Sequence, residues 1–302
     1  MALSSQLLHS DDLVSAHCVR CRPHNHVCGA TEAAGANTLA FPLNGVFVKH
    51  LDDGREVVAH AGQAVFFNAG ESYRVSHPQG GDDCFVLELA ESTQREILEA
   101  LDPAAADYVA MPFRASHAHL PAKALLQQRL LWRCLRERSH RDLEIQERSL
   151  GLFADALAAM PLEPPRRRRT RPATLRRRRE RVRAAAIRLA LDPAQHWTLA
   201  ALAQHVQSSP FHLARDFRSE HGSSIYRYLL NVRLARALDA VLDSDAMLTE
   251  IALDAGFATP SHFTAAFRGR YGVAPSDLRR DVRAATACEL RRISTAATAA
   301  PP

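Results

Sequence analysis

The feature that most constrains this chain is a helical pattern broken by a tight turn, which occurs twice in the C-terminal third of the sequence. In residues 248–280, an apolar repeat with helical spacing stops at Gly256, a residue able to take the left-handed conformation that closes a helix. Thr259 and Pro260 then provide an N-cap and a first-turn proline, and the residues after them carry a new apolar stripe. The pattern predicts a helix, a turn and a second helix.

A copy of this pattern lies earlier in the chain. Leu202 and Ala203 belong to one apolar face, and Ser209 and Pro210 repeat the cap and the proline. Residues 224–242 keep helical apolar spacing throughout, which predicts one long helix joining the two units. A single unit would also suit a helical hairpin buried in an all-α domain. The repetition favours two helix-turn-helix units held apart by a rigid spacer.

Side chains that point away from the apolar stripes form a narrow row on each second helix. They are small, polar or basic, which suits entry into the major groove of DNA. The predicted DNA-binding residues are Ser209, Phe211, His212, Arg215 and Arg218 in the first unit, and Thr259, Ser261, Thr264 and Arg268 in the second.

A family resemblance is carried by Ser209, Pro210, Gly222, Tyr228, Arg233 to Ala237, Ile251, Ala252, Gly256, Phe257, Phe263, Phe267, Gly272 and Pro275. This set resembles the tandem helix-turn-helix domain of the AraC/XylS transcription regulators, over about residues 180–280. The resemblance implies promoter DNA and RNA polymerase as partners, a homodimer, and activation as the commoner outcome, with repression left open. Many members carry Arg where this chain has Ala265, so we expect the first unit to contribute more of the sequence reading.

Charge is shared unevenly along the chain. Residues 1–160 carry 14 Lys and Arg against 20 Asp and Glu, whereas residues 161–302 carry 24 Arg against 13 Asp and Glu. The second part is therefore strongly cationic, as expected of the part that binds a polyanion.

The N-terminal residues 1–13 have neither a basic region nor an apolar core of the kind that targets a protein for export. No stretch approaches the roughly 18 uninterrupted apolar residues of a membrane span. The 6 Cys of this long chain do not suggest a secreted disulfide framework. We therefore expect a cytoplasmic protein with reduced thiols and no membrane association.

Residues 41–90 have strand character interrupted by Gly and Asp turns, which predicts a small barrel or sandwich. Residues 62–77 resemble the second motif of the cupin barrels that form the sensor half of many AraC/XylS regulators. Tyr73 stands where a metal-binding cupin would place His, so no enzyme-type cupin metal centre is expected. Phe47, Phe67 and Tyr73 are instead predicted to line a pocket for a small-molecule effector. The alternative is that these rings only fill the barrel.

Residues 118–138 and 142–160 read as two amphipathic helices. Similar regulators dimerise through such helices, and the alternative is that they only pack on the barrel. The predicted fold class is α+β, with a cupin-like sensor and dimerisation domain at 1–160 and an Arg- and Pro-rich linker at 161–175. An all-α DNA-binding domain at 176–283 and a disordered tail at 284–302 complete the predicted organisation.

Thiols and imidazoles gather ahead of the predicted barrel. Cys18, Cys21, His24 and Cys28 are candidate ligands of zinc, because thiolate and neutral imidazole are its usual partners. Cys84 could approach from the last predicted strand. A redox-responsive thiol pair and plain packing are the alternatives.

An alternative of another class is a cupin-type enzyme, or a metal or redox sensor, fused to a DNA-binding domain. An enzyme would need a complete His and Glu metal set or a nucleophile with its base, and the sequence supplies neither. A DNA-repair methyl acceptor would need a four-Cys zinc site, whereas only Cys18 and Cys21 have the required spacing. We therefore predict no catalytic residues, and a transcription regulator that responds to a small-molecule or metal signal through its N-terminal domain.

Overall fold

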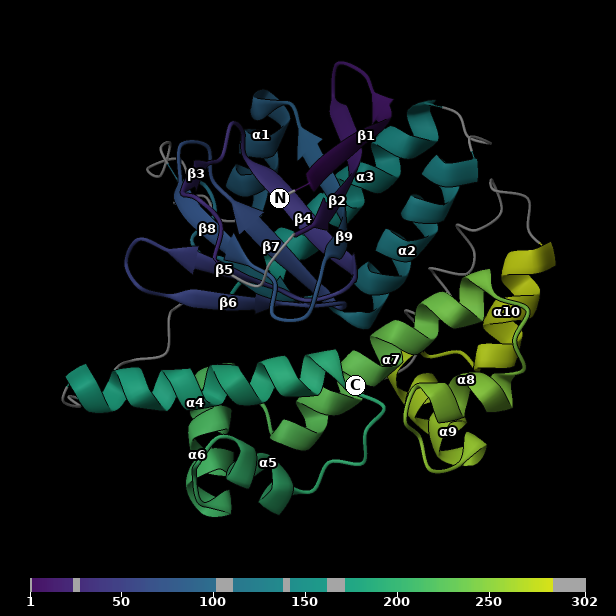
Figure 1. The fold of residues 1–302 in the computed structure, drawn as a ribbon. Helices are drawn as coiled ribbons and strands as arrows, with labels where there is room; N and C mark the ends of the chain where they lie inside the picture. The colour runs from purple at the N-terminus through teal and green to yellow at the C-terminus, as the bar shows by residue number, and fades with distance from the viewer. Residues whose placement is uncertain (1, 24–27, 102–110, 138–141, 162–171, 285–302) are drawn as a thin grey trace.

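The computed structural model of the chain describes residues 2–23, 28–101, 111–137, 142–161 and 172–284. An N-terminal part built on antiparallel β-sheets stands against a C-terminal part made of helices (Figure 1). The predicted combination of a β-rich N-terminal part and an all-α C-terminal part is confirmed.

In the part of the chain that the structure describes, ten strands form two sheets. The six-stranded sheet has the order β1-β2-β9-β4-β7-β10 and the four-stranded sheet the order β3-β8-β5-β6. The strands are β1 (Ala2–Ser10), β2 (Val14–Arg22), β3 (Glu32–Ala33), β4 (Thr38–Asn44), β5 (Phe47–Leu51), β6 (Glu56–Ala59), β7 (Gln63–Phe67), β8 (Ser72–Ser76), β9 (Asp82–Leu89) and β10 (His117–His119). The strands expected between residues 45 and 89 are confirmed. The residues before them, which we expected to lie ahead of the barrel, instead form β1 and β2 within the larger sheet.

The six-stranded sheet is covered on both faces, because its side chains alternate between two cores. One face packs against helices through buried residues such as Ala16, Phe41 and Phe85. The other face meets the smaller sheet in a core that includes Phe47 and Val65. On each of these two faces, apolar side chains occupy every second position of a strand. This alternation fixes the register of the strand.

Among the described residues, the helices of the N-terminal part are α1 (Glu91–Leu101), α2 (Ala122–Glu137) and α3 (Asp142–Ala158). The helix expected from residue 118 starts later, because residues 117–119 pair with β7 as β10. The apolar stripe of α2 is buried within the chain, and Leu131 is only 1% exposed. This stripe was the expected dimer seam, so the packing agrees with the alternative in which α2 packs on the barrel.

The C-terminal part contains α4 (Pro172–Leu191), α5 (Leu199–His205), α6 (Pro210–His221), α7 (Ile225–Asp243), α8 (Leu248–Asp254), α9 (Pro260–Tyr271) and α10 (Pro275–Ala284). The two predicted helix pairs are α5–α6 and α8–α9, and α7 is the predicted long connection. Helix α4 begins inside the range assigned to the linker. The rest of that range beyond residue 161, and the tail beyond residue 284, lie outside the described residues.

The two parts pack directly on each other. One buried cluster contains residues of the large sheet, α2, α7 and α9. Arg129 of α2 pairs with Asp239 of α7 at 2.8 Å, and Arg270 of α9 donates to the Leu120 carbonyl at 2.8 Å. In the described part of the chain, no helix is both long enough and apolar enough to cross a membrane.

Candidate functional site

Helix α6 is delimited by its own sequence. The Ser209 hydroxyl accepts a hydrogen bond from the His212 backbone N–H at 3.2 Å, which is the N-cap bond expected from the Ser-Pro pair. Gly222 closes the helix in the left-handed conformation, with φ of 70°. Leu213 and Phe217 are buried at 1% and 0% exposure and anchor the helix to the core beneath it.

The opposite face of α6 is open to solvent, with Phe211, His212, Arg215 and Arg218 all exposed. Phe211 is 71% exposed, which is unusual for a large apolar side chain. The Arg215 guanidinium donates from Nε and Nη2 to the Oδ1 of buried Asp216, at 3.2 and 3.0 Å. Asp216, which the sequence analysis did not single out, therefore orients Arg215.

Helix α9 repeats this construction. The Thr259 hydroxyl accepts from the His262 backbone N–H at 3.1 Å, and Gly272 closes the helix. Phe263 and Phe267 are buried, so the helix turns its remaining sides outward. The predicted DNA-binding residues of this unit, Thr259, Ser261 and Arg268, are exposed, and Thr264 is partly exposed.

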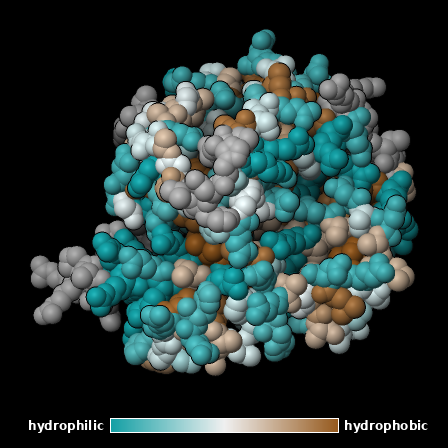
Figure 2. All heavy atoms as spheres, in the orientation of Figure 1, coloured by the Kyte–Doolittle hydropathy of each residue, from teal (hydrophilic) through white to brown (hydrophobic). Residues whose placement is uncertain are grey.

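Helix α7 connects the helix-turn-helix unit α5–α6 to the unit α8–α9. Its 19 residues span about 28 Å at about 1.5 Å per residue. In Figure 1, α6 and α9 lie at opposite ends of the C-terminal part, on the side away from the β-sheets. Much of the molecular face in that orientation is hydrophilic (Figure 2). The helix that connects the two capped helices is therefore somewhat shorter than one turn of DNA, about 34 Å.

Comparison with known proteins agrees with this geometry. Residues 202–281 match the family model described as "Helix-turn-helix domain". The transcriptional activator RhrA of Rhizobium meliloti is 42% identical over 73 residues, which are 24% of this chain and 23% of that protein. A protein of Streptomyces lividans named as an AraC-like transcription regulator is 33% identical over 89 residues, 30% of this chain and 29% of that protein. The C-terminal part is an AraC-type helix-turn-helix domain.

The chain thus spans less than a third of the length of either of these relatives. Among solved structures, the DNA-binding domain of AdpA in complex with a target DNA is 28% identical. That match covers 35% of this chain and 93% of the other, with a TM-score of 0.31. The cupin-like assignment of the N-terminal part stays a prediction.

The predicted effector-binding aromatics surround a buried lysine instead of an open space. Lys49 is 0% exposed, and its Nζ lies 4.0 Å from the centre of the Phe67 ring. Nζ also donates to Glu71 Oε2 at 2.6 Å, and burial lowers the pKa of Lys49. Tyr73 meets Phe67 edge to face at 4.9 Å, while Phe47 lies in the core between the sheets. The role of these rings in binding an effector stays a prediction.

A groove of about 560 Å³ lies elsewhere, between the N-terminal part and the AraC-type domain. It is lined by Cys18, Arg20, Leu43, Asn44, Asp83, Arg129, Trp132, Arg136, Arg236, Asp239 and Asp243. Because α2 and α7 both line the groove, a molecule bound in it would touch both parts of the chain. The sequence analysis missed this groove, since its walls come together only in the folded chain.

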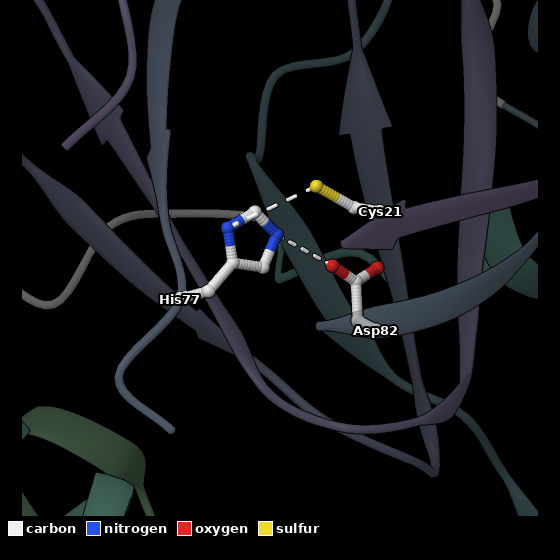
Figure 3. Close-up of side chains that lie close together, drawn as sticks. All are labelled: Cys21, His77 and Asp82. Carbon is white, nitrogen blue, oxygen red and sulfur yellow. Dashed lines mark hydrogen bonds and ion pairs between the residues drawn. The ribbon is translucent and has the colours of Figure 1, made fainter. Parts of the chain in front are cut away.

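A cluster of a thiol, an imidazole and a carboxylate lies at one end of the two sheets (Figure 3). The His77 Nδ1 lies 4.0 Å from the Cys21 Sγ, and the His77 Nε2 lies 2.6 Å from Asp82 Oδ1. The Cys84 Sγ donates to Asp82 Oδ2 at 3.1 Å. Cys21, His77 and Asp82 are 5%, 3% and 6% exposed, so the cluster is nearly closed to solvent.

This cluster differs from the predicted zinc ligands. Cys18 and Cys21 are three residues apart on β2, so their side chains point to opposite faces of the sheet and do not meet one ion. Cys18 lines the groove next to α2 instead. Cys28 is partly exposed, and His24 lies outside the described residues. Among the candidates that the structure describes, Cys18, Cys21 and Cys28, Cys21 is the one that lies in a cluster of metal-ligating groups. His77 and Asp82, which were not predicted, complete that cluster.

Histidines also meet where the first helix-turn-helix unit touches the sheets, and we call His60, His117, His119, His221 and Tyr228 the histidine joint. The His60 ring lies 5.0 Å from Tyr228 and 6.0 Å from His119. The His221 ring, at the end of α6, lies 5.2 Å from Tyr228. Burial lowers the pKa of His60 to about 3, and burial beside the other imidazoles lowers that of His221 to about 3. The joint is therefore built from neutral rings.

Proposed function

We propose that this chain is a sequence-specific DNA-binding transcription regulator whose AraC-type domain binds promoter DNA. The observation that supports it best is the pair of capped helices α6 and α9, whose polar and basic faces are exposed and whose separation is set by α7. Both relatives described above are named as transcription regulators. The two helices would enter successive major grooves on one side of the duplex.

The N-terminal part is proposed to receive a signal and pass it to the AraC-type domain. The groove between α2 and α7 supports this proposal, because its arginines and aspartates come from both parts of the chain. Burial raises the pKa of Asp239, one of the residues that line the groove, to about 6. A charged molecule bound next to Asp239 would therefore change how much of this carboxyl group is ionised. A small polar molecule bound there would change the packing of α2 against α7.

Selection of duplexes from a random pool by the full-length protein tests the DNA-binding proposal. We expect the selected sequences to contain two conserved half-sites about one helical turn, roughly 10 base pairs, apart. A variant with Ser261→Ala and Arg268→Ala should lose conservation at one half-site only. Selection of a single half-site by the unchanged protein would contradict the use of both helices.

Activation through RNA polymerase and action as a homodimer belong to the same proposal. A reporter carrying the selected site should rise in transcription when the protein is present, and a fall would identify a repressor.

For dimerisation, Leu131 is unsuitable as a probe because it is buried within the chain. Leu143 of α3 is 72% exposed and lies in the predicted dimer region. Sedimentation of the full chain with Leu143→Asp should show a monomer, while a dimer would exclude this surface.

An enzymatic role is not supported by the cluster at Cys21, although the order of thiol, imidazole and carboxylate resembles that of a nucleophile with its base. The thiol is 5% exposed, which closes it to a substrate. Burial, and after it the charge of Asp82, raise the pKa of Cys21 to about 11, so the reactive thiolate is scarce at neutral pH. We propose that the chain acts without catalysis.

A further inference from the structure

We propose that Cys21, His77 and Asp82, with Cys84 beside them, bind a zinc-like divalent transition-metal ion that ties the two sheets together. The three first-named residues each offer one ligand atom, and these atoms all lie within 4.8 Å of one another. They come from the end of β2, the residue after β8 and the start of β9. An ion at their centre would therefore cross-link strands of both sheets.

The donor atoms match the chemistry of zinc. Sulfur, imidazole nitrogen and carboxylate oxygen are all zinc ligands, and structural sites hold four of them in a tetrahedron. Bond lengths of about 2.0 to 2.3 Å place neighbouring ligand atoms about 3.3 to 3.8 Å apart. His77 can bind the ion through only one ring nitrogen. If that atom is Nε2, its 2.6 Å separation from Asp82 Oδ1 would lengthen on binding, and the ligand atoms of the three residues, now within 4.8 Å of one another, would draw together around the ion. Rotation of side chains supplies changes of this size.

Cys84 can complete the set. It pairs with Asp82 on the same face of β9, two residues further along the strand, and is 5% exposed. Its Sγ already lies 3.1 Å from Asp82 Oδ2. On binding, the Cys21 thiol releases its proton to solvent as the sulfur–metal bond forms. Cys84 likewise loses its proton to solvent when it binds as the fourth ligand. Two thiolates and one carboxylate then surround the 2+ ion, and the ion offsets most of their charge inside the buried site.

The backbone around the cluster is closely fitted. A Cβ on Gly81 would lie 1.9 Å from the Cys21 carbonyl oxygen, so only glycine lets the loop between β8 and β9 pass this strand. A Cβ on Gly45 would lie 2.3 Å from the Gly81 carbonyl oxygen. These contacts hold His77 and Asp82, at the two ends of the loop, next to Cys21. The ligand positions are thus set by the fold before any ion arrives.

The same side chains also form a hydrogen-bonded chain that needs no metal, and this is the alternative that an experiment must separate. Full-length protein, purified without a metal-binding tag, is analysed for bound metal and then titrated with Co²⁺ after chelation. We expect about one equivalent of metal, and with Co²⁺ the absorption of a thiolate-to-cobalt bond. Cys21→Ser and Cys84→Ser should each weaken binding at least tenfold.

Cys18→Ser is the matched control, because Cys18 is an equally buried thiol on the same strand that faces the other way. This variant should bind metal like the unchanged protein. Chelation should lower the Tm of the unchanged protein and of Cys18→Ser, but not that of Cys21→Ser, since an ion bound only by the folded state stabilises it. Absence of a thiolate–cobalt band in the unchanged protein would overturn the proposal even if a variant fails to fold. Equal loss of metal in Cys18→Ser and Cys21→Ser would overturn it as well.

Discussion

At the scale of single residues, the site on α6 depends on Arg215 and the carboxylate that orients it. The Arg215 side chain is 59% exposed and forms an ion pair with Asp216. The Asp216 Oδ1 also lies 3.7 Å from the Arg178 Nε. Asp216 is 4% exposed, so its carboxylate is held among its neighbours beneath the exposed face of α6. A guanidinium presented in this way can form two parallel hydrogen bonds with the edge of a guanine.

We predict that Arg215→Ala weakens binding to the selected site by about 1 to 3 kcal/mol and relaxes the preference at one base pair. Fluorescence anisotropy with the selected duplex and with a random duplex measures both effects. Arg280→Ala, on the exposed surface of α10, is the control and should leave binding nearly unchanged. An equal loss on both duplexes would make Arg215 a phosphate contact.

A second prediction concerns the buried ion pair of Lys49 and Glu71. Lys49→Met leaves the Glu71 carboxylate, only 11% exposed, without its cation, and should destabilise the chain by about 3 to 5 kcal/mol. Adding Glu71→Gln should restore a large part of the loss, because the uncompensated charge is then gone. Urea unfolding of both single variants and the double variant measures this coupling. Additive losses would show that the pair does not interact energetically.

At the scale of elements, helix caps define where the second helix of each helix-turn-helix unit begins. The Thr259 hydroxyl is placed to satisfy a backbone N–H at the start of α9. We predict that Thr259→Ala lowers the free energy of unfolding by about 0.5 to 2 kcal/mol, whereas Thr259→Ser keeps the bond and changes it little. Chemical denaturation compares the variants. A loss of equal size in Thr259→Ser would assign the effect to the methyl group.

At the scale of the whole molecule, the histidine joint couples the two parts of the chain. The Nε2 of His60 and the hydroxyl of Tyr228 are buried and have no hydrogen-bond partner among the described residues. The groups that face His60 electrostatically are the imidazoles of His119, His221 and His117, and Arg270 faces His119. None of these groups carries a negative charge, so none of them would stabilise a proton taken up by His60.

We therefore predict that acid weakens the fold. The pKa of His60 is held at about 3, below its ordinary value of 6.5, so above pH 6.5 both the folded and the unfolded state are neutral at this residue. Below pH 6.5 the unfolded chain gains a proton that the folded chain does not. The free energy of unfolding should then fall with pH, by up to about 1.4 kcal/mol per unit for this residue, until the pH nears 3.

Urea unfolding at pH 7, 6 and 5 measures this dependence. His60→Gln should show a shallower decline than the unchanged protein, and His196→Gln, an exposed site away from the joint, should show the same decline as the unchanged protein. The comparison between variants matters because Asp239 acts in the opposite direction. Its pKa is raised to about 6 by burial, so it adds stability as the pH falls through that value. An identical slope in His60→Gln would rule out the joint as the acid-sensitive element.

The sequence by itself determined the elements whose signals are local. Ser209-Pro210 and Thr259-Pro260 mark helix starts, and Gly256 marks a helix end, because a cap depends only on a few neighbouring residues. The same holds for the alternating strands between residues 45 and 89. The exposed faces of α6 and α9 follow from helical spacing alone, which is why the predicted DNA-binding residues lie on them.

Contacts between distant segments were decided only by the tertiary structure. Cys21 and His77 are 56 residues apart, and strand pairing brought them together while strand geometry turned Cys18 away. The Lys49 ion pair occupies the space next to the rings that the sequence analysis assigned to an effector. The apolar stripe of α2 predicted burial, but an amphipathic helix reads the same whether a second chain or its own chain covers it. Only the fold showed that the sheets and the AraC-type domain cover the apolar stripe of α2. Burial depends on which surfaces meet, and not on the order of residues within one helix.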